Sequence, residues 1–207
     1  MAVAALLAAC GGESSSDANQ PGGTYGVRVT DASFPTEQHL GQTSLMRLAI
    51  RNTGKKTLPT LAVTVSVAGK EGQDSVLPFG IRDPEANLAQ PDRPVWVLAA
   101  GYPKLAGSSE PGGASTSNPK TFSLGPLKPD ATTEAVWKLS AVKAGNFTVL
   151  YRVNAGLSGS AKATTNGVAA GGSFATEISA VPPDTEVTDS GEVVEKATQR
   201  PRSEPGE

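Results

Sequence analysis

Few side chains in this chain could perform chemistry. Its 207 residues include one cysteine, Cys10, one histidine, His39, and two methionines. A zinc or copper site needs several nitrogen or sulfur ligands that converge on the metal, and a serine hydrolase needs a histidine beside an activated serine. No serine motif accompanies His39, for which we expect a loop position before the second strand. The sequence therefore predicts a protein that is not an enzyme, with no catalytic residue, no metal and no cofactor.

The context of Cys10 predicts lipid modification. The residue follows the apolar run AVAALLAA and precedes two glycines, and the stretch LAAC resembles the bacterial lipobox, whose cysteine is acylated after signal cleavage. A signal peptide usually opens with basic residues, but none stands before Arg28, so we expect the true start to lie upstream of Met1. The alternatives are a small buried hydrophobic residue near a chain end, or a chance match.

Composition divides the chain into segments. We expect a truncated lipoprotein signal over residues 1–10 and a flexible Gly- and Ser-rich tether over 11–23. A single domain is expected over 24–182, with a long irregular insertion at 69–119. Residues 183–207 are rich in acidic side chains and poor in apolar ones, which predicts an acidic flexible tail.

The overall charge does not favour nucleic acid as a partner. Eighteen basic and twenty acidic residues give a net charge of -2. The 23 glycines and 16 prolines, together with only 5% aromatic residues, favour turns and strands over helices. A single cysteine cannot form an intramolecular disulfide, and no apolar run reaches the roughly 18 residues of a membrane-spanning helix.

Apolar residues alternate with polar ones along several segments, as expected for strands with one buried face. The pattern is clear over residues 24–32, 46–52 and 61–67. It returns at 132–139 and 147–153, on either side of a turn at 143–146, and this pair predicts a β-hairpin. Two further strands are expected at 158–165 and 173–181, separated by the flexible sequence NGVAAGG. The fold class is therefore all-β, an antiparallel immunoglobulin-like β-sandwich with disordered N- and C-terminal tails.

The insertion at 69–119 contains the residues that we expect to contact a partner. Trp96 and Tyr102 are large amphipathic rings on a loop-rich segment, and such rings often anchor interfaces. The alternative for Trp96 is that it covers one open end of the sandwich. Short strands are expected within VLPFGI and PVWVLAAG, and a mobile loop at 108–119.

Acidic residues of the same insertion offer a weaker possibility. Asp83, Glu85 and Asp92 could supply oxygen ligands to calcium. Their spacing matches no EF-hand, so a solvated acidic loop is the expectation.

Two blocks resemble the bacterial immunoglobulin-like modules of the CARDB kind. The shared features are Asn52 and Gly54 at a strand end, the loop GPLKP, the strand tryptophan Trp137, and the sequence KAGNFT that opens the next strand. The resemblance covers roughly residues 24–182 and implies the fold. Because such modules share no catalytic site, it implies no active residue.

The expected function is that of a membrane-anchored lipoprotein of the cell envelope, outside the cytoplasm, whose immunoglobulin-like domain serves protein interaction or structural support. The implied partners are the membrane, through the lipid on Cys10, and an envelope protein or glycan. The alternative is a lipoprotein that binds a small ligand or glycan through the 69–119 insertion.

Overall fold

A computed structural model describes residues 21–68, 79–81, 94–108, 114–115, 120–157, 159–181, 185–191 and 193–195. Over these ranges the protein is all-β and contains no helix, which confirms the predicted fold class. Among the described residues there is accordingly no helix that is long and apolar enough to span a membrane. Cys10 lies outside the described residues, as do the acidic positions Asp83, Glu85 and Asp92.

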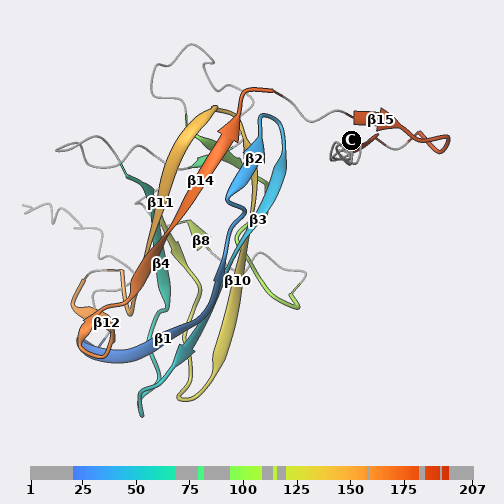
Figure 1. The fold of residues 1–207 in the computed structure, drawn as a ribbon. Coiled ribbons are helices and arrows are strands. Elements are labelled where there is room, and N and C mark those ends of the chain that lie inside the picture. The colour runs from blue at the N-terminus through green and yellow to red at the C-terminus, as the bar shows by residue number, and fades with distance from the viewer. Residues whose placement is uncertain are drawn as a thin grey trace, which may run out of the picture.

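The strands form two large sheets and one small one (Figure 1). The first sheet contains, in spatial order, β13 (Val168–Ala169), β12 (Ala161–Thr165), β1 (Gly23–Ser33), β3 (Thr43–Asn52), β10 (Thr132–Ala141), β6 (Trp96–Leu98) and β5 (Phe79–Ile81), with β7 (Lys104–Leu105) also paired to β10. The second contains β2 (Glu37–His39), β14 (Gly171–Ser179), β11 (Gly145–Asn154), β4 (Ala62–Val67), β9 (Thr121–Ser123) and β8 (Ala114–Ser115).

The two large sheets pack face to face as a sandwich. The order β1-β3-β10-β6 in one sheet and β14-β11-β4 in the other corresponds to the ABED and GFC sheets of the immunoglobulin fold. Most strand pairs are antiparallel, as expected. Three described pairs are parallel, namely β1 with β12, β14 with β2, and β5 with β6, so both sheets are mixed rather than purely antiparallel.

The core lies between the sheets and follows the alternation of the sequence. Met46, Leu48 and Ile50 of β3 are fully buried, and so are Val63 and Val65 of β4 in the opposite sheet. Because successive side chains of a strand point to opposite faces, the residues between them are exposed or only partly buried. The predicted inward faces of these strands are therefore confirmed.

The predicted hairpin at 132–153 is wrong in its pairing. Both strands exist, as β10 and β11, but β10 pairs with β3, β6 and β7 while β11 pairs with β14 and β4. Residues 142–144 carry the chain from one sheet to the other, and the Val142 N–H donates to the Val95 carbonyl at 2.9 Å. The apolar faces of the two strands therefore meet across the core instead of lying side by side.

Several segments that were expected to be loops contain short strands. His39 ends β2 rather than lying in a loop, Ala114–Ser115 forms β8 inside the expected mobile loop, and Val168–Ala169 forms β13 inside NGVAAGG. Tertiary neighbours supply these pairings, because runs of two or three residues carry too weak a pattern to predict them. The expected strands within VLPFGI and PVWVLAAG are confirmed as β5 and β6.

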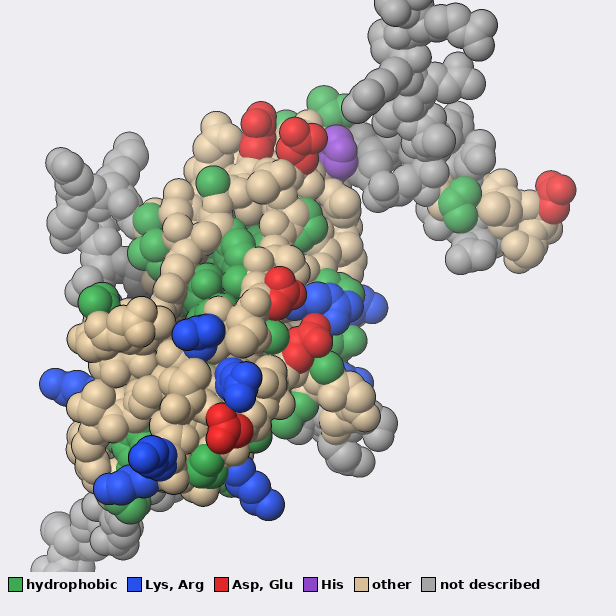
Figure 2. Space-filling model, turned by 60° about the horizontal axis from the view of Figure 1, so that its bottom comes forward, with side chains coloured by type: hydrophobic (Ala, Val, Ile, Leu, Met, Phe, Trp, Pro, Cys, Tyr) green, Lys and Arg blue, Asp and Glu red, His purple; other side chains and the backbone are tan. Residues whose placement is uncertain are grey.

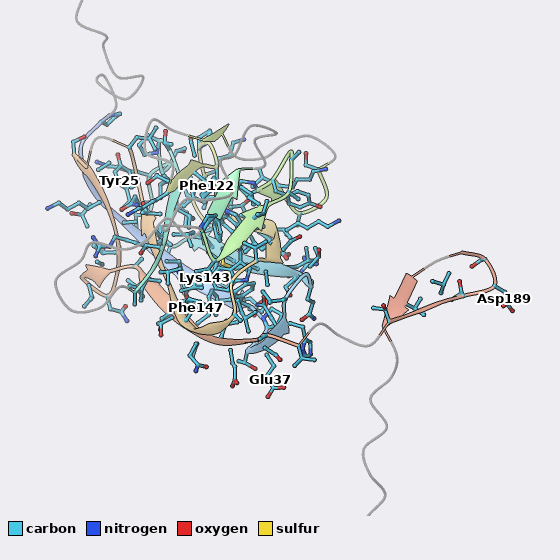
Figure 3. The ribbon with its side chains drawn as sticks, turned by 90° about the horizontal axis from the view of Figure 1, so that it is seen from above. Tyr25, Glu37, Phe122, Lys143, Phe147 and Asp189 are labelled. Atoms are coloured by element: carbon cyan, nitrogen blue, oxygen red, sulfur yellow. The ribbon has the colours of Figure 1, made fainter. Side chains whose placement is uncertain are left out.

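The described part of the tail is a hairpin of β15 (Thr185–Val187) and β16 (Val193–Glu195), where only a flexible segment was expected. Asp189 lies in its turn, well away from the sandwich (Figure 3).

The Asn52–Gly54 motif fixes the end of β3. The Asn52 side chain is fully buried, and its Nδ2 donates to the carbonyls of Lys56 and Leu127, both at 2.9 Å. Its Oδ1 accepts from the Gly54 N–H at 2.9 Å. One carboxamide thus holds the loop that leaves β3 against the loop that enters β10.

Candidate functional site

Trp96 lies in the core and not on the surface. Its ring is fully buried and its Nε1 donates to Gln38 Oε1 at 2.9 Å. It makes edge contacts with Phe34, at 5.4 Å between ring centroids, and with Phe147, at 5.8 Å. A fully buried ring presents no surface to a partner, so the structure corresponds to the alternative in which Trp96 closes the sandwich.

Tyr102 lies at the edge of the core, and its contact role stays a prediction. Its ring is partly buried and packs against the buried cluster. Lys104 Nζ stands 5.2 Å from the ring centroid, within the range of a cation–π contact. The structure therefore does not bring Trp96 and Tyr102 together as one exposed pair.

His39 is held at the end of β2. Its Nδ1 is 3.2 Å from the Val181 carbonyl oxygen, a contact consistent with a ring that donates from this nitrogen. Within the described ranges, no group of three or more His, Cys, Asp or Glu side chains could hold a metal ion.

A concave surface lies at one side of the sandwich, around the start of β14. Two grooves adjoin here. We call the first, of about 510 Å³, the outer groove; it lies over β4 and β11. The second, of about 480 Å³, is the flank groove; it lies between β1 and the segment that enters β14. Tyr151, Ala169, Ala170 and Gly171 line both.

Sequence reasoning missed this site. Its one visible signal was the glycine-rich run NGVAAGG, which was interpreted as a spacer. Among the described residues, Ser66 and Lys120 of the outer groove stand just before and just after the 69–119 insertion, and the ligand site expected within that insertion stays a prediction. Residues 69–78, 82–93, 109–113 and 116–119 lie outside the described residues.

Polar side chains cover the floor of the outer groove. Thr64 Oγ1 and Thr121 Oγ1 are 2.9 Å apart, and Asn154 Nδ2 donates to Thr64 Oγ1 at 3.0 Å. Arg152 and Lys120 line the same groove, and none of the described residues that line it carries a carboxylate. This surface can hydrogen-bond to polar groups and favours a partner with negative charge.

Tyr151 forms the wall between the two grooves. Its ring stacks on Phe174 at 5.3 Å between centroids, with an interplanar angle of 30°. The ring occupies space that a side chain at position 172 would need, since a Cβ on Gly172 would stand 2.5 Å from Tyr151 Oη. Burial raises the pKa of the Tyr151 phenol above its ordinary value of 10.0, because the ionised form is poorly solvated there.

This shift predicts a loss of stability at alkaline pH. The phenol ionises more readily in the unfolded chain, so the folded state keeps its full stability below about pH 10 and loses it as the pH rises through the raised pKa. We expect Tyr151→Phe to reduce the fall in unfolding free energy between about pH 9 and pH 11, measured by urea denaturation at each pH. An equal fall in both proteins would contradict the assignment.

Comparison with known proteins gives similarity at the level of the fold. No protein-family model matches the chain, and no curated protein matches its sequence. A CARDB domain from Pyrococcus furiosus, described in complex with di-metal ions, is 11% identical over 75% of this chain and 86% of that chain, with a TM-score of 0.39.

Two larger proteins show similar values. Part of an Escherichia coli alpha-2-macroglobulin, from domain MG7 to the C-terminus, is 15% identical over 74% of this chain and 16% of that chain, with a TM-score of 0.38. A beta-glucosidase from Listeria innocua, in complex with glucose, is 11% identical over 76% of this chain and 16% of that chain, with a TM-score of 0.39. At these identities and scores the similarities say nothing about function, and the fold assignment rests on the strand order itself.

Proposed function

We propose that this chain is a lipid-anchored module of the bacterial cell envelope that acts by binding another protein. The observation that carries the proposal is the lipobox-like LAAC at Cys10, followed by a polar tether and then by a β-sandwich. The grooved side of the sandwich, with its cations and exposed hydroxyl groups, supports a role in binding.

The tether gives the sandwich reach from the membrane. Residues 11–23 would extend to at most about 45 Å if fully stretched. The sandwich begins at Gly23, where β1 pairs with β12 at Ala161, so the tether enters beside the strands that lead to the grooves. A domain held in this way can meet partners near the membrane without itself entering the bilayer.

The test is removal of the acylated thiol. We expect Cys10→Ala, expressed in a bacterial host, to move the protein from the membrane fraction to the soluble fraction, because it removes the sulfur that would carry the acyl chains. Ser14→Ala, in the tether, is the matched control and should stay in the membrane fraction. Mass spectrometry of the wild-type protein should find diacylglycerol on Cys10, and a free thiol on a cytosolic protein would refute the proposal.

A further inference from the structure

Among the described residues, one side of β14 is unpaired along much of its length. On one side β14 pairs with β11 from Gly171 to Ile178, but on the other side β2 pairs only with Glu177–Ser179. The Glu177 N–H points to this second side, where it donates to the Thr36 carbonyl at 2.8 Å. Because alternate residues of a strand direct their N–H and C=O groups to the same side, those of Ser173 and Ala175 face the unpaired side as well.

We call residues Gly171–Thr176 the β14 edge. Natural sheets protect exposed edges with charged residues, proline, bulges or very short strands. The other free edges of the described sheets follow this rule: β1 has a bulge between Val29 and Asp31, and β5, β8 and β13 have only two or three residues. The β14 edge, with the sequence GGSFAT, has none of these devices. It is therefore suited to accept another strand.

The core is incompletely covered beside this edge. Val29 and Ala32 of β1 and Tyr151 and Phe174 of the opposite sheet are only partly buried, although all four pack on the core cluster. The flank groove lies between β1 and the start of β14. In Figure 2, hydrophobic side chains are visible at the surface in the middle of the molecule. A strand placed against the β14 edge would cover them with every second side chain.

Charge around the grooves indicates the chemistry of that strand. Arg28 lines the flank groove and Arg152 the outer groove, and neither forms an ion pair within the described part of the chain. Asp31 is the one carboxylate among the described residues that line either groove. Lys and Arg side chains predominate in the lower half of the face in Figure 2. The side chains of an added strand that face outward would therefore be favoured if they were acidic.

We propose that the β14 edge accepts an extended segment of a partner protein, with apolar residues at alternate positions and acidic residues between them, which adds as a further strand to the sheet. Main-chain hydrogen bonds would supply affinity, and the groove would select the alternate side chains. The inference rests on the proposed function as a binding module and specifies how that module binds.

The test uses the full chain carrying Cys10→Ala and a synthetic peptide of alternating valine and glutamate. A length of about nine residues covers the edge, which spans roughly 20 Å. We expect Ser173→Pro to weaken peptide binding by about tenfold or more, because it removes an N–H that faces the edge without touching the β11 ladder. Ser173→Ala keeps the N–H and is the matched control, with binding unchanged. Titration calorimetry gives both affinities.

Hydrogen exchange of the unsubstituted edge provides a second measurement if Ser173→Pro does not fold. The peptide should slow exchange of the Ser173 and Ala175 amides by about tenfold or more and leave that of Thr148, on the outer face of β11, unchanged. A peptide with lysine in place of glutamate should bind more weakly. The inference would be overturned by any of three results. These are no binding of the peptide, equal binding by wild type and Ser173→Pro, and dimers of the free protein that Ser173→Pro abolishes. None of these results would affect the membrane anchoring tested with Cys10→Ala, so the two proposals fail separately.

Discussion

Replacing Trp96 with alanine lowers the free energy of unfolding by about 4 kcal/mol, a large part of the 5–15 kcal/mol that holds a typical domain together. The ring is fully buried and touches Phe34 and Phe147, so its removal leaves a cavity between the two sheets. It also leaves the buried Gln38 Oε1 without its donor. Urea denaturation followed by the fluorescence of Trp137, the second of the two tryptophans, measures the change.

Phenylalanine substitutions separate the contribution of the aromatic ring to stability from that of its hydrogen bond. Trp96→Phe keeps an aromatic ring but loses the bond to Gln38, whereas Trp137 Nε1 is buried and has no hydrogen-bond partner among the described residues. We therefore expect Trp137→Phe to lower the free energy of unfolding less than Trp96→Phe does, by a difference of about 1 kcal/mol or more. The reverse order would show that the Gln38 bond does not stabilise the core.

Replacing Asn52 with alanine lowers the free energy of unfolding by about 3 kcal/mol. The substitution removes three hydrogen bonds of a fully buried carboxamide and leaves the carbonyls of Lys56 and Leu127 without this donor. The Gly54 N–H loses its acceptor, so its hydrogen exchange should become faster as well. Denaturant unfolding together with exchange at Gly54 tests both effects.

Asn146→Ala is the control for this loss. Asn146 is exposed at the start of β11, so its substitution should change stability by no more than about 0.5 kcal/mol. If Asn52→Ala changes stability equally little, the hydrogen bonds of Asn52 do not hold the two loops together in the way that the structure indicates.

The candidate site could not be predicted from the sequence because it consists of surfaces that stay exposed after distant strands have packed together. Its residues come from β1, β4, Lys120, β11 and the segment 165–172, which are far apart in the chain. The two tryptophans show the same limit. Trp96 in PVWVL and Trp137 in AVWKL have similar surroundings in sequence, and one was interpreted as a contact residue and the other as a strand residue. Both are fully buried, because each ring faces the opposite sheet, where Trp96 meets Phe147 and Trp137 meets Phe122.

The sequence by itself determined where the long strands lie and which of their faces turn inward. Met46, Leu48 and Ile50 are buried as their spacing predicts, because alternation depends only on a strand's own residues and on one face meeting the core. The tertiary structure alone decided which strands pair. A turn reverses the chain equally well within one sheet or between two, and only competition among distant strands placed β10 and β11 in opposite sheets. That same competition left the β14 edge without a neighbour among the described strands.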